Sequence, residues 1–353
     1  MNLYRMAAAA LAVLLLGGSP HAHAQSFFFV GPADGDFFDV NNWNDAADGT
    51  GSAPPVDSLP NSTTGAIAID LVIDSTSVLA EGQVDFGVGS LTITNDGSLE
   101  ITGSGNDIDF NSATTLVLSG STLIADGDVV LEGSITIANS VVTATTDDIE
   151  IQDNAVIDIS GSVITAGDNF FFDSFVGTVT SSEFSSADRL GIRAPGGVDA
   201  DVVVFDTNIS IQAGAGDTDN IFTDNLDSGG SLTLLGASTL LSDTVEEEVD
   251  LIIGGTSSAT LGGNGVEILD NGSTATLTTF GASLIVNEIT DDPRAFIING
   301  RTGLSYADDS TRWNVTDWNG LDAVTLQIVP EPSTAAVLGV AGVASMLRRR
   351  KRG

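Results

Sequence analysis

The amino-acid sequence predicts an all-β protein, a right-handed parallel β-helix or β-solenoid with coils of about 20 residues. Short β-type triplets recur from Val84 onward, and their first residues are 24, 21, 20, 21 and 20 positions apart. The triplets are Val84–Phe86, Ile108–Phe110, Val129–Leu131, Ile149–Ile151, Phe170–Phe172 and Leu190–Ile192. A second set of short segments, each opened by a serine, keeps nearly the same period; the serines are Ser98, Ser121, Ser140, Ser162 and Ser182. Two independent features with one period indicate strands that stack coil on coil.

The rest of the body agrees with this fold class. No long stretch of residues 25–329 has an apolar period of 3.6, which argues against long amphipathic helices. Alternate residues of the short strands are apolar, and the turns between them are rich in Gly, Asn, Asp and Ser. The period blurs after residue 192. A β-sandwich or jelly roll, which also uses short strands and frequent turns, therefore stays open as the alternative.

The first 24 residues predict a signal peptide. Arg5 precedes an apolar run of 11 residues, Met6–Leu16, and an Ala-His-Ala site follows. A basic start, a short apolar core and small residues at Ala22 and Ala24 form the pattern that signal peptidase cuts after transport by the Sec translocon. The apolar run is too short to span a bilayer comfortably. We therefore expect export of the chain and cleavage after Ala24.

Residues 25–83 are expected to form an N-terminal β cap. Aromatic residues are dense in the first part of this segment: Phe27, Phe28, Phe29, Phe37, Phe38 and Trp43. A repetitive stack needs such a cap, because its terminal coil would otherwise expose the apolar core to water. The β-solenoid body then occupies residues 84–328.

The charge and the residue inventory exclude several functional classes. Residues 25–329 contain five basic and 47 acidic residues, a formal charge of -42, and no lysine. So acidic a surface repels nucleic acid and anionic lipid. Cleavage after Ala24 removes both histidines, and the chain has no cysteine, so Ser–His triads and His or Cys metal sites are excluded. We expect the protein not to be an enzyme.

Calcium is the one cofactor that the acidic turns suggest. Asp126 and Asp128 flank a glycine, and Asp217 and Asp219 lie in a second acidic turn. Carboxylate oxygens are the ligands that Ca²⁺ prefers. No EF-hand loop is complete in these turns, and aspartate is common in turns for its backbone geometry alone. The expectation is therefore no cofactor, or a weak calcium site at these four aspartates.

The last residues, 329–353, have three parts in a fixed order. A Pro-Glu-Pro motif comes first, at Pro330, Glu331 and Pro332. The apolar segment 333–347 follows and is expected to form a transmembrane helix. Five basic residues end the segment: Arg348, Arg349, Arg350, Lys351 and Arg352. By the positive-inside rule this basic cluster stays in the cytoplasm and stops transfer.

This order closely resembles the PEP-CTERM sorting signal of Gram-negative bacteria, a tail that also occurs in ice-binding proteins. The resemblance implies a partner, exosortase, a membrane-embedded cysteine peptidase that cuts near the motif and releases or transfers the body. It implies anchoring at the inner membrane, followed by passage to the cell envelope or the extracellular space. The segment around Asn42, Trp43 and Pro54-Pro55 resembles the N-terminal part of bacterial surface solenoids with autotransporter-like repeats, which are frequent in planctomycetes.

Together these features lead us to expect a structural or adhesive protein of the cell envelope or extracellular matrix, with extracellular polysaccharide as a partner and no nucleic acid. A carbohydrate-binding or polysaccharide-active β-helix protein is the alternative. Its basic candidates are Arg189, Arg193, Arg294 and Arg301. Ice binding is a remoter alternative, because the Thr-x-Thr segments do not recur with the coil period.

Overall fold

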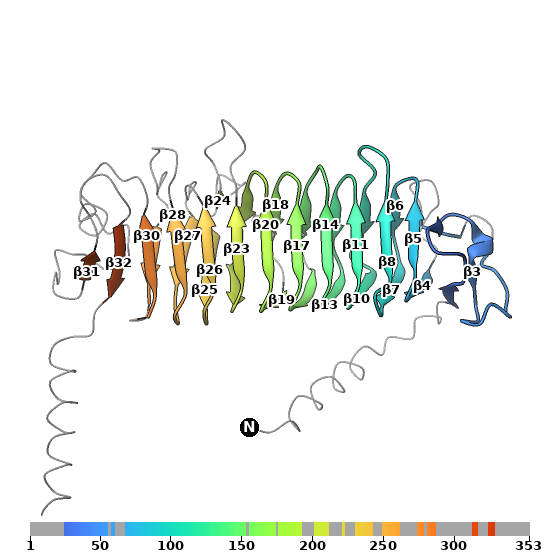
Figure 1. Cartoon of the computed structure of the whole chain (residues 1–353), viewed down its shortest axis with the longest axis horizontal. Helices are drawn as coiled ribbons and strands as arrows, with labels where there is room; N and C mark the ends of the chain where they lie inside the picture. Colours follow the sequence, from blue (N-terminus) through green and yellow to red (C-terminus); the bar gives the residue numbers. More distant parts are fainter. Residues whose placement is uncertain are drawn as a thin grey trace, which may run out of the picture.

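A computed structural model shows three β-sheets that run along the length of the molecule (Figure 1) and enclose one apolar core. The structure describes residues 25–55, 58–60, 68–152, 155–173, 176–192, 201–211, 221–222, 230–242, 249–261, 274–278, 281–286, 313–316 and 324–328. The chain visits sheet A, sheet B and sheet C in turn, and each visit to the three sheets makes one coil. Each coil lies against the preceding one, so the sheets run along the length of the molecule.

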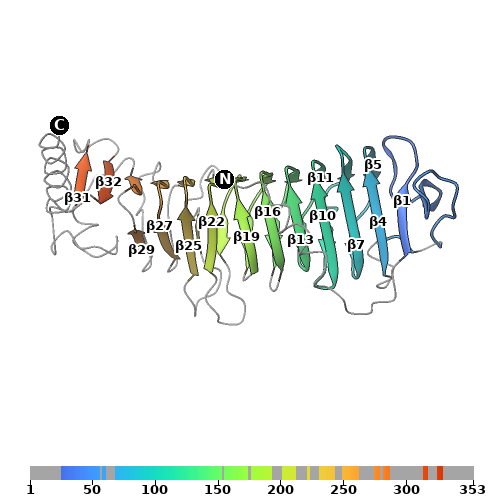
Figure 2. The same ribbon diagram turned by 90° about the horizontal axis from the view of Figure 1, so that it is seen from below.

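Sheet A has 12 strands and is seen from outside in Figure 2. Its strands are β1 (Gln25–Phe29), β3 (Trp43–Asn44), β4 (Ile69–Asp74), β7 (Gly89–Thr94), β10 (Thr114–Ser119), β13 (Ser134–Ala138), β16 (Val156–Ser160), β19 (Val176–Thr180), β22 (Asp201–Phe205), β25 (Gly230–Leu235), β27 (Val249–Ile253) and β29 (Thr274–Leu277). Neighbouring strands from β1 through β4 to β29 are parallel. Only β3, which pairs with β1, is antiparallel among the described strands of this sheet.

Sheet B has 13 strands and faces the viewer in Figure 1. Its strands are β2 (Gly35–Asp36), β5 (Ser77–Ala80), β8 (Ser98–Ile101), β11 (Thr122–Ala125), β14 (Val141–Ala144), β17 (Val163–Ala166), β20 (Glu183–Ser186), β23 (Asn208–Ile211), β26 (Thr239–Ser242), β28 (Ser258–Leu261), β30 (Ser283–Val286), β31 (Trp313–Thr316) and β32 (Val324–Ile328). The ladder is parallel from β2 to β30. At its end β32 pairs antiparallel with both β30 and β31.

Sheet C is the narrowest, with seven strands. They are β6 (Val84–Phe86), β9 (Ile108–Phe110), β12 (Val129–Leu131), β15 (Ile149–Ile151), β18 (Phe170–Phe172), β21 (Leu190–Ile192) and β24 (Ile221–Phe222), all parallel. The six triplets predicted from the sequence are therefore the first six strands of this sheet.

The core is a column because alternate residues of every short strand point inward. In β10, for example, Thr114, Leu116 and Leu118 are buried while the residues between them are partly exposed. Because the ladders are in register, similar side chains stack on one another in neighbouring coils. The rings of Phe86 and Phe110 stack with centroids 5.1 Å apart and 10° between their planes. Backbone pairing between coils and apolar burial within them hold the fold, in a chain with no cysteine.

The N-terminal end of the column is covered by β1, β2, β3 and the short 3-10 helix η1 (Val40–Asn42). Trp43 is fully buried there, and its Nε1–H donates to the carbonyl oxygen of Phe37 at 2.8 Å. The Trp43 ring meets Phe29 and Phe37 edge-on, with centroids 5.2 and 5.4 Å away. These aromatic contacts lie within residues 25–83, the segment that the sequence analysis expects to be a cap.

The β-solenoid predicted from the sequence is confirmed in its coarse form, with parallel coils of about 21 residues. Parallel ladders through all three sheets exclude the alternative β-sandwich or jelly roll, whose sheets are antiparallel. Parallel stacking already includes β4 and β5, upstream of Val84, where the sequence repeat begins. A later apolar triplet, Leu251–Ile253, does not continue the series of sheet C strands, because it belongs to β27 of sheet A.

The predicted signal peptide, residues 1–24, and the predicted transmembrane helix, residues 333–347, lie outside the described residues. Within the part of the chain that the structure describes, no helix is long and apolar enough to cross a membrane.

Candidate functional site

Acidic side chains gather where the chain turns from sheet B into sheet C. The residue before each C strand occupies the same place in successive coils. Asp107, Asp128 and Asp148 fill this place before β9, β12 and β15, and we call them the aspartate column. Asn169 and Arg189 fill it in the next two coils. Because the C strands pair in register, these carboxylates lie about one coil spacing, roughly 4.8 Å, apart along the ladder.

Each aspartate of the column accepts a hydrogen bond from the next coil. The Oδ1 atom of Asp107 accepts from the backbone N–H of Asp128 at 2.9 Å, and that of Asp128 accepts from the backbone N–H of Asp148 at 2.9 Å. Asp148 Oδ1 in turn accepts from the backbone N–H of Asn169 at 2.8 Å. The column therefore pins one coil to the next, which explains why an acceptor side chain is used at this turn.

The same position makes ionisation costly. Burial raises the pKa of Asp128 to about 6, against the opposing effect of the backbone hydrogen bond from Asp148. Repulsion from Asp107, Asp147 and Asp148 raises that pKa further. Burial also raises the pKa of Asp148, with added repulsion from Asp168 and Glu150. Asp128 therefore takes up a proton near pH 6, where an ordinary aspartate is still ionised.

A second set of acids lies on the outer side of sheet C itself. Asp85, Asp109 and Glu150 occupy the middle positions of β6, β9 and β15. Burial raises the pKa of Asp109, and Asp107, Asp85 and Glu150 add repulsion. Gln83 opposes this by donating from Nε2 to Asp109 Oδ2 at 3.1 Å. Sheet C and its leading turn therefore form the acidic edge of the solenoid.

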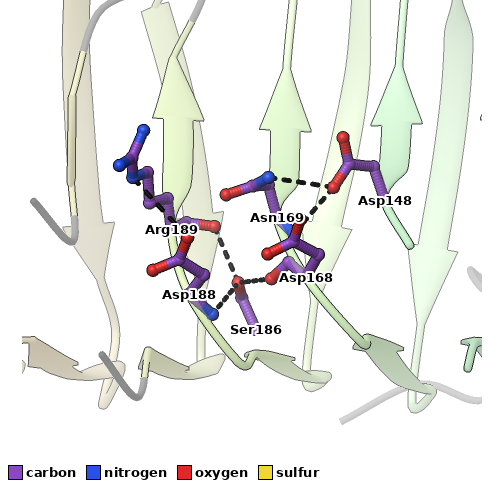
Figure 3. Close-up of polar contacts among 6 residues, drawn as sticks. All are labelled: Asp148, Asp168, Asn169, Ser186, Asp188 and Arg189. Carbon is purple, nitrogen blue, oxygen red and sulfur yellow. Dashed lines mark hydrogen bonds and ion pairs between the residues drawn. The ribbon is translucent and has the colours of Figure 1, made fainter. Parts of the chain in front are cut away.

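The aspartate column ends at Asn169 and Arg189, drawn in Figure 3. Asn169 Nδ2 donates to Asp148 Oδ1 at 3.0 Å, and Arg189 Nε lies 3.7 Å from Asp188 Oδ2. The buried Ser186 Oγ lies 2.7 Å from the carbonyl oxygens of both Asp168 and Arg189, and it accepts from the backbone N–H of Asp188. A neutral amide followed by a guanidinium stops the accumulation of negative charge along the column.

The structure places two of the four calcium candidates. Asp126 and Asp128 both lie in the β11–β12 turn, while Asp217 and Asp219 lie outside the described residues. In the described segments, no group of three or more His, Cys, Asp or Glu side chains is arranged to hold a metal ion. The acidic turn instead aligns Asp128 with neighbours from other coils. Sequence reasoning missed that alignment, although the turns before the triplets were seen to be rich in aspartate.

Of the four basic candidates for polysaccharide binding, the structure describes one. Arg189 ends the aspartate column, whereas Arg193, Arg294 and Arg301 lie outside the described residues. A carbohydrate-binding surface typically exposes a ladder of aromatic rings. Among the described large apolar side chains that are exposed, Phe205 is the one aromatic, at 47% exposure.

The sorting and cleavage residues lie outside the described part of the chain. They are Ala22, Ala24, Pro330, Glu331, Pro332, Arg348, Arg349, Arg350, Lys351 and Arg352. Their roles stay predictions from the sequence.

Comparison of the chain with protein-family models, with curated proteins and with solved structures finds no match.

Proposed function

We propose that this chain is an exported structural or adhesive protein of the cell envelope or extracellular matrix. The observation that carries the proposal is the stack of parallel coils. Each coil contacts only its neighbours, so the stacked coils form an elongated body with long outer faces. Such a body suits contact along a surface or a polymer, including extracellular polysaccharide.

The charge of the body supports a place outside the cell. Residues 25–329 carry a formal charge of -42, and the acidic edge concentrates part of it. So large a charge of one sign keeps a protein soluble and resists aggregation. It also disfavours nucleic acid and anionic lipid as partners. Calcium is not needed for this function, since the coils are joined by backbone and aspartate hydrogen bonds.

In this proposal the two terminal segments direct the export and the sorting of the chain. Residues 1–24 direct the chain to the Sec translocon and signal peptidase. The tail then holds it at the inner membrane, where an exosortase-type peptidase recognises Pro330, Glu331 and Pro332. Right-handed coiling of the body is part of the same proposal, because parallel β–β connections strongly favour that hand.

Mass spectrometry of secreted and membrane fractions tests the sorting step. The wild-type chain should be recovered outside the cell without residues 333–353. A variant with Pro330→Ala and Pro332→Ala should keep its tail and accumulate in the membrane fraction. A variant with Ser134→Ala, on the body, serves as the matched control. Recovery of only full-tailed wild-type protein in the membrane would reject sorting through this signal.

A further inference from the structure

The outer face of sheet B is nearly free of charge. We define the B face as the outward-pointing alternate residues of β5 to β30, which Figure 1 shows as one row of strands. These positions hold Ser, Thr, Asn, Val, Leu or Ile, with two exceptions, Glu100 and Glu183. In a body of formal charge -42, few of these outward positions are therefore acidic.

The other two faces carry more acid. Sheet A exposes Asp70, Asp74, Asp158, Asp201 and Asp250 at its outward positions. Sheet C and its leading turn form the acidic edge described above. A second molecule with the same charge distribution is repelled by both of these faces. The B face is therefore where two copies approach at the lowest electrostatic cost.

The B face also exposes apolar side chains whose burial is favourable: Val141, Val163 and Leu241 are 38%, 39% and 48% exposed. Sheet A exposes Val156, Val203 and Phe205 as well, but Asp158 and Asp201 lie on the same strands as these residues, so the low charge and not the apolar area distinguishes the B face. Several hydroxyl groups of the B face already have partners in the next coil. Ser185 Oγ donates to Thr165 Oγ1 at 3.0 Å. A hydroxyl group that is already hydrogen-bonded within its own chain costs less free energy to bury, because it does not lose its only partner when water is displaced.

The coil repeat makes the face complementary to itself. Every parallel strand adds one row of side chains at the same spacing of about 4.8 Å, so rows of one copy match the grooves of another copy by construction. The face is about 43 Å long from β5 to β30 and about 13 Å wide, which buries roughly 1,100 Å² when two copies meet. That area lies just below the range of stable interfaces, which begins at about 1,200 Å², so we expect a weak dimer.

From these observations we infer that the B face is an interface with a second copy of this chain, packed face to face about a two-fold axis. Such isologous pairing uses the same patch on both copies. The acidic faces point away from the interface, yet their repulsion persists at a distance. The dimer is therefore weak at low ionic strength and strengthens as salt screens the two charged bodies. The inference rests on sheet B alone and not on the export proposed above.

Sedimentation velocity on the full chain tests the inference. The wild type should form a dimer whose population rises from low to high sodium chloride. A double variant, Thr143→Asp with Thr165→Asp, puts charge in the centre of the B face and should weaken the dimer about tenfold or more. Its matched control is Thr115→Asp with Ser134→Asp, a pair of adjacent outward positions of sheet A with no acidic neighbour in register, which should dimerise like wild type. Circular dichroism checks that all variants keep their β content.

Cysteine cross-linking locates the interface independently, because the chain has no cysteine of its own. Single Thr143→Cys or Ser210→Cys variants on the B face should yield dimers with a short thiol cross-linker, and Thr136→Cys on sheet A should not. A monomer at every concentration and salt level would overturn the inference. So would cross-linking through sheet A. A monomer that binds a neutral polysaccharide, with binding lost in the Thr143→Asp and Thr165→Asp variant, would assign the face to a carbohydrate and overturn it equally.

Discussion

The position of Asp128 between coils has two opposing effects on stability. Its Oδ1 atom accepts the backbone N–H of Asp148, which ties two coils together. Burial and the acids Asp107, Asp147 and Asp148 work against its ionisation, and the pKa is raised to about 6. Between about 3.8 and 6 the folded chain binds more protons here than the unfolded chain does. The free energy of unfolding therefore falls as pH rises through about 6.

Replacing the carboxylate by an amide separates these two effects. In Asp128→Asn the Oδ1 acceptor for the Asp148 N–H is kept, and the buried charge is removed. We expect the variant to melt about 1–3 °C higher than wild type at neutral pH, with a smaller difference at about pH 5. Thermal melting followed by circular dichroism at both pH values measures this. Glu100→Gln, on the exposed face of sheet B, removes one charge without touching the column and should leave the pH dependence unchanged. A variant that melts below wild type at neutral pH would show that the charge itself stabilises the coil.

At the scale of the element, a column of buried hydroxyl groups joins sheet A to sheet B. Ser121, Ser140, Ser162 and Ser182 are all buried at this turn. The backbone N–H of each of the first three donates to the Oγ of the next, at 3.2, 3.2 and 3.3 Å. Each Oγ from Ser140 onward also donates to a carbonyl oxygen two residues earlier, at 2.8 or 2.9 Å. The column thus satisfies backbone groups that the sheet ladders leave unpaired.

Ser162→Ala removes one rung of this column. The backbone N–H of Ser140 then loses its acceptor in a buried site, which costs about 1–3 kcal/mol of unfolding free energy. Chemical denaturation measures the loss. Ser134→Ala, an exposed serine at the start of β13, is the control and should be close to neutral. Equal stability of both variants would mean that the serine period reflects turn preference and not coil-to-coil bonding.

Much of this element structure could be predicted from the sequence. The triplets recur because each is a strand of sheet C, and Ser121, Ser140, Ser162 and Ser182 recur because they share one place at the turn into sheet B. Ser98 does not share this place, since it is the first residue of β8 and pairs in register with Thr122. The aspartate column could not be found in the same way. Asp128 is in register with Asp107 and Asp148 only once the strands pair, and an aspartate in a turn looks the same whether or not it stacks. The low charge of the B face was missed too, because outward and inward residues separate only when the strand bounds are known.

The pairing of the strands explains why the sequence period becomes irregular after residue 192. The interval from Leu190 in β21 to Ile221 in β24 is longer than one ordinary coil, yet the two strands still pair in register. Extra residues in a turn change the spacing along the sequence without changing the stack. A regular period in the sequence is thus not necessary for a regular stack of coils.

At the scale of the whole molecule, the three faces differ in charge, and this difference links the fold to both proposals. In the proposed function the acidic faces keep the body in solution outside the cell, and in the inferred dimer the B face receives a second copy. Both statements require that the coils add length in one direction. A chain folded back on itself would mix the faces and would lose the uniform spacing of the B face.

The central requirement is that the coils stack in one direction, and distances along one column of sheet B test it most directly. Leu79, Ile124, Ser210 and Thr260 share one outward column. Spin labels on paired cysteine substitutions, diluted with unlabelled chain, report their separations by pulsed electron paramagnetic resonance. At about 4.8 Å per coil we expect about 19 Å for Ile124–Ser210, about 29 Å for Ile124–Thr260 and about 38 Å for Leu79–Thr260. A Leu79–Thr260 distance no longer than that of Ile124–Ser210 would contradict a linear stack of coils.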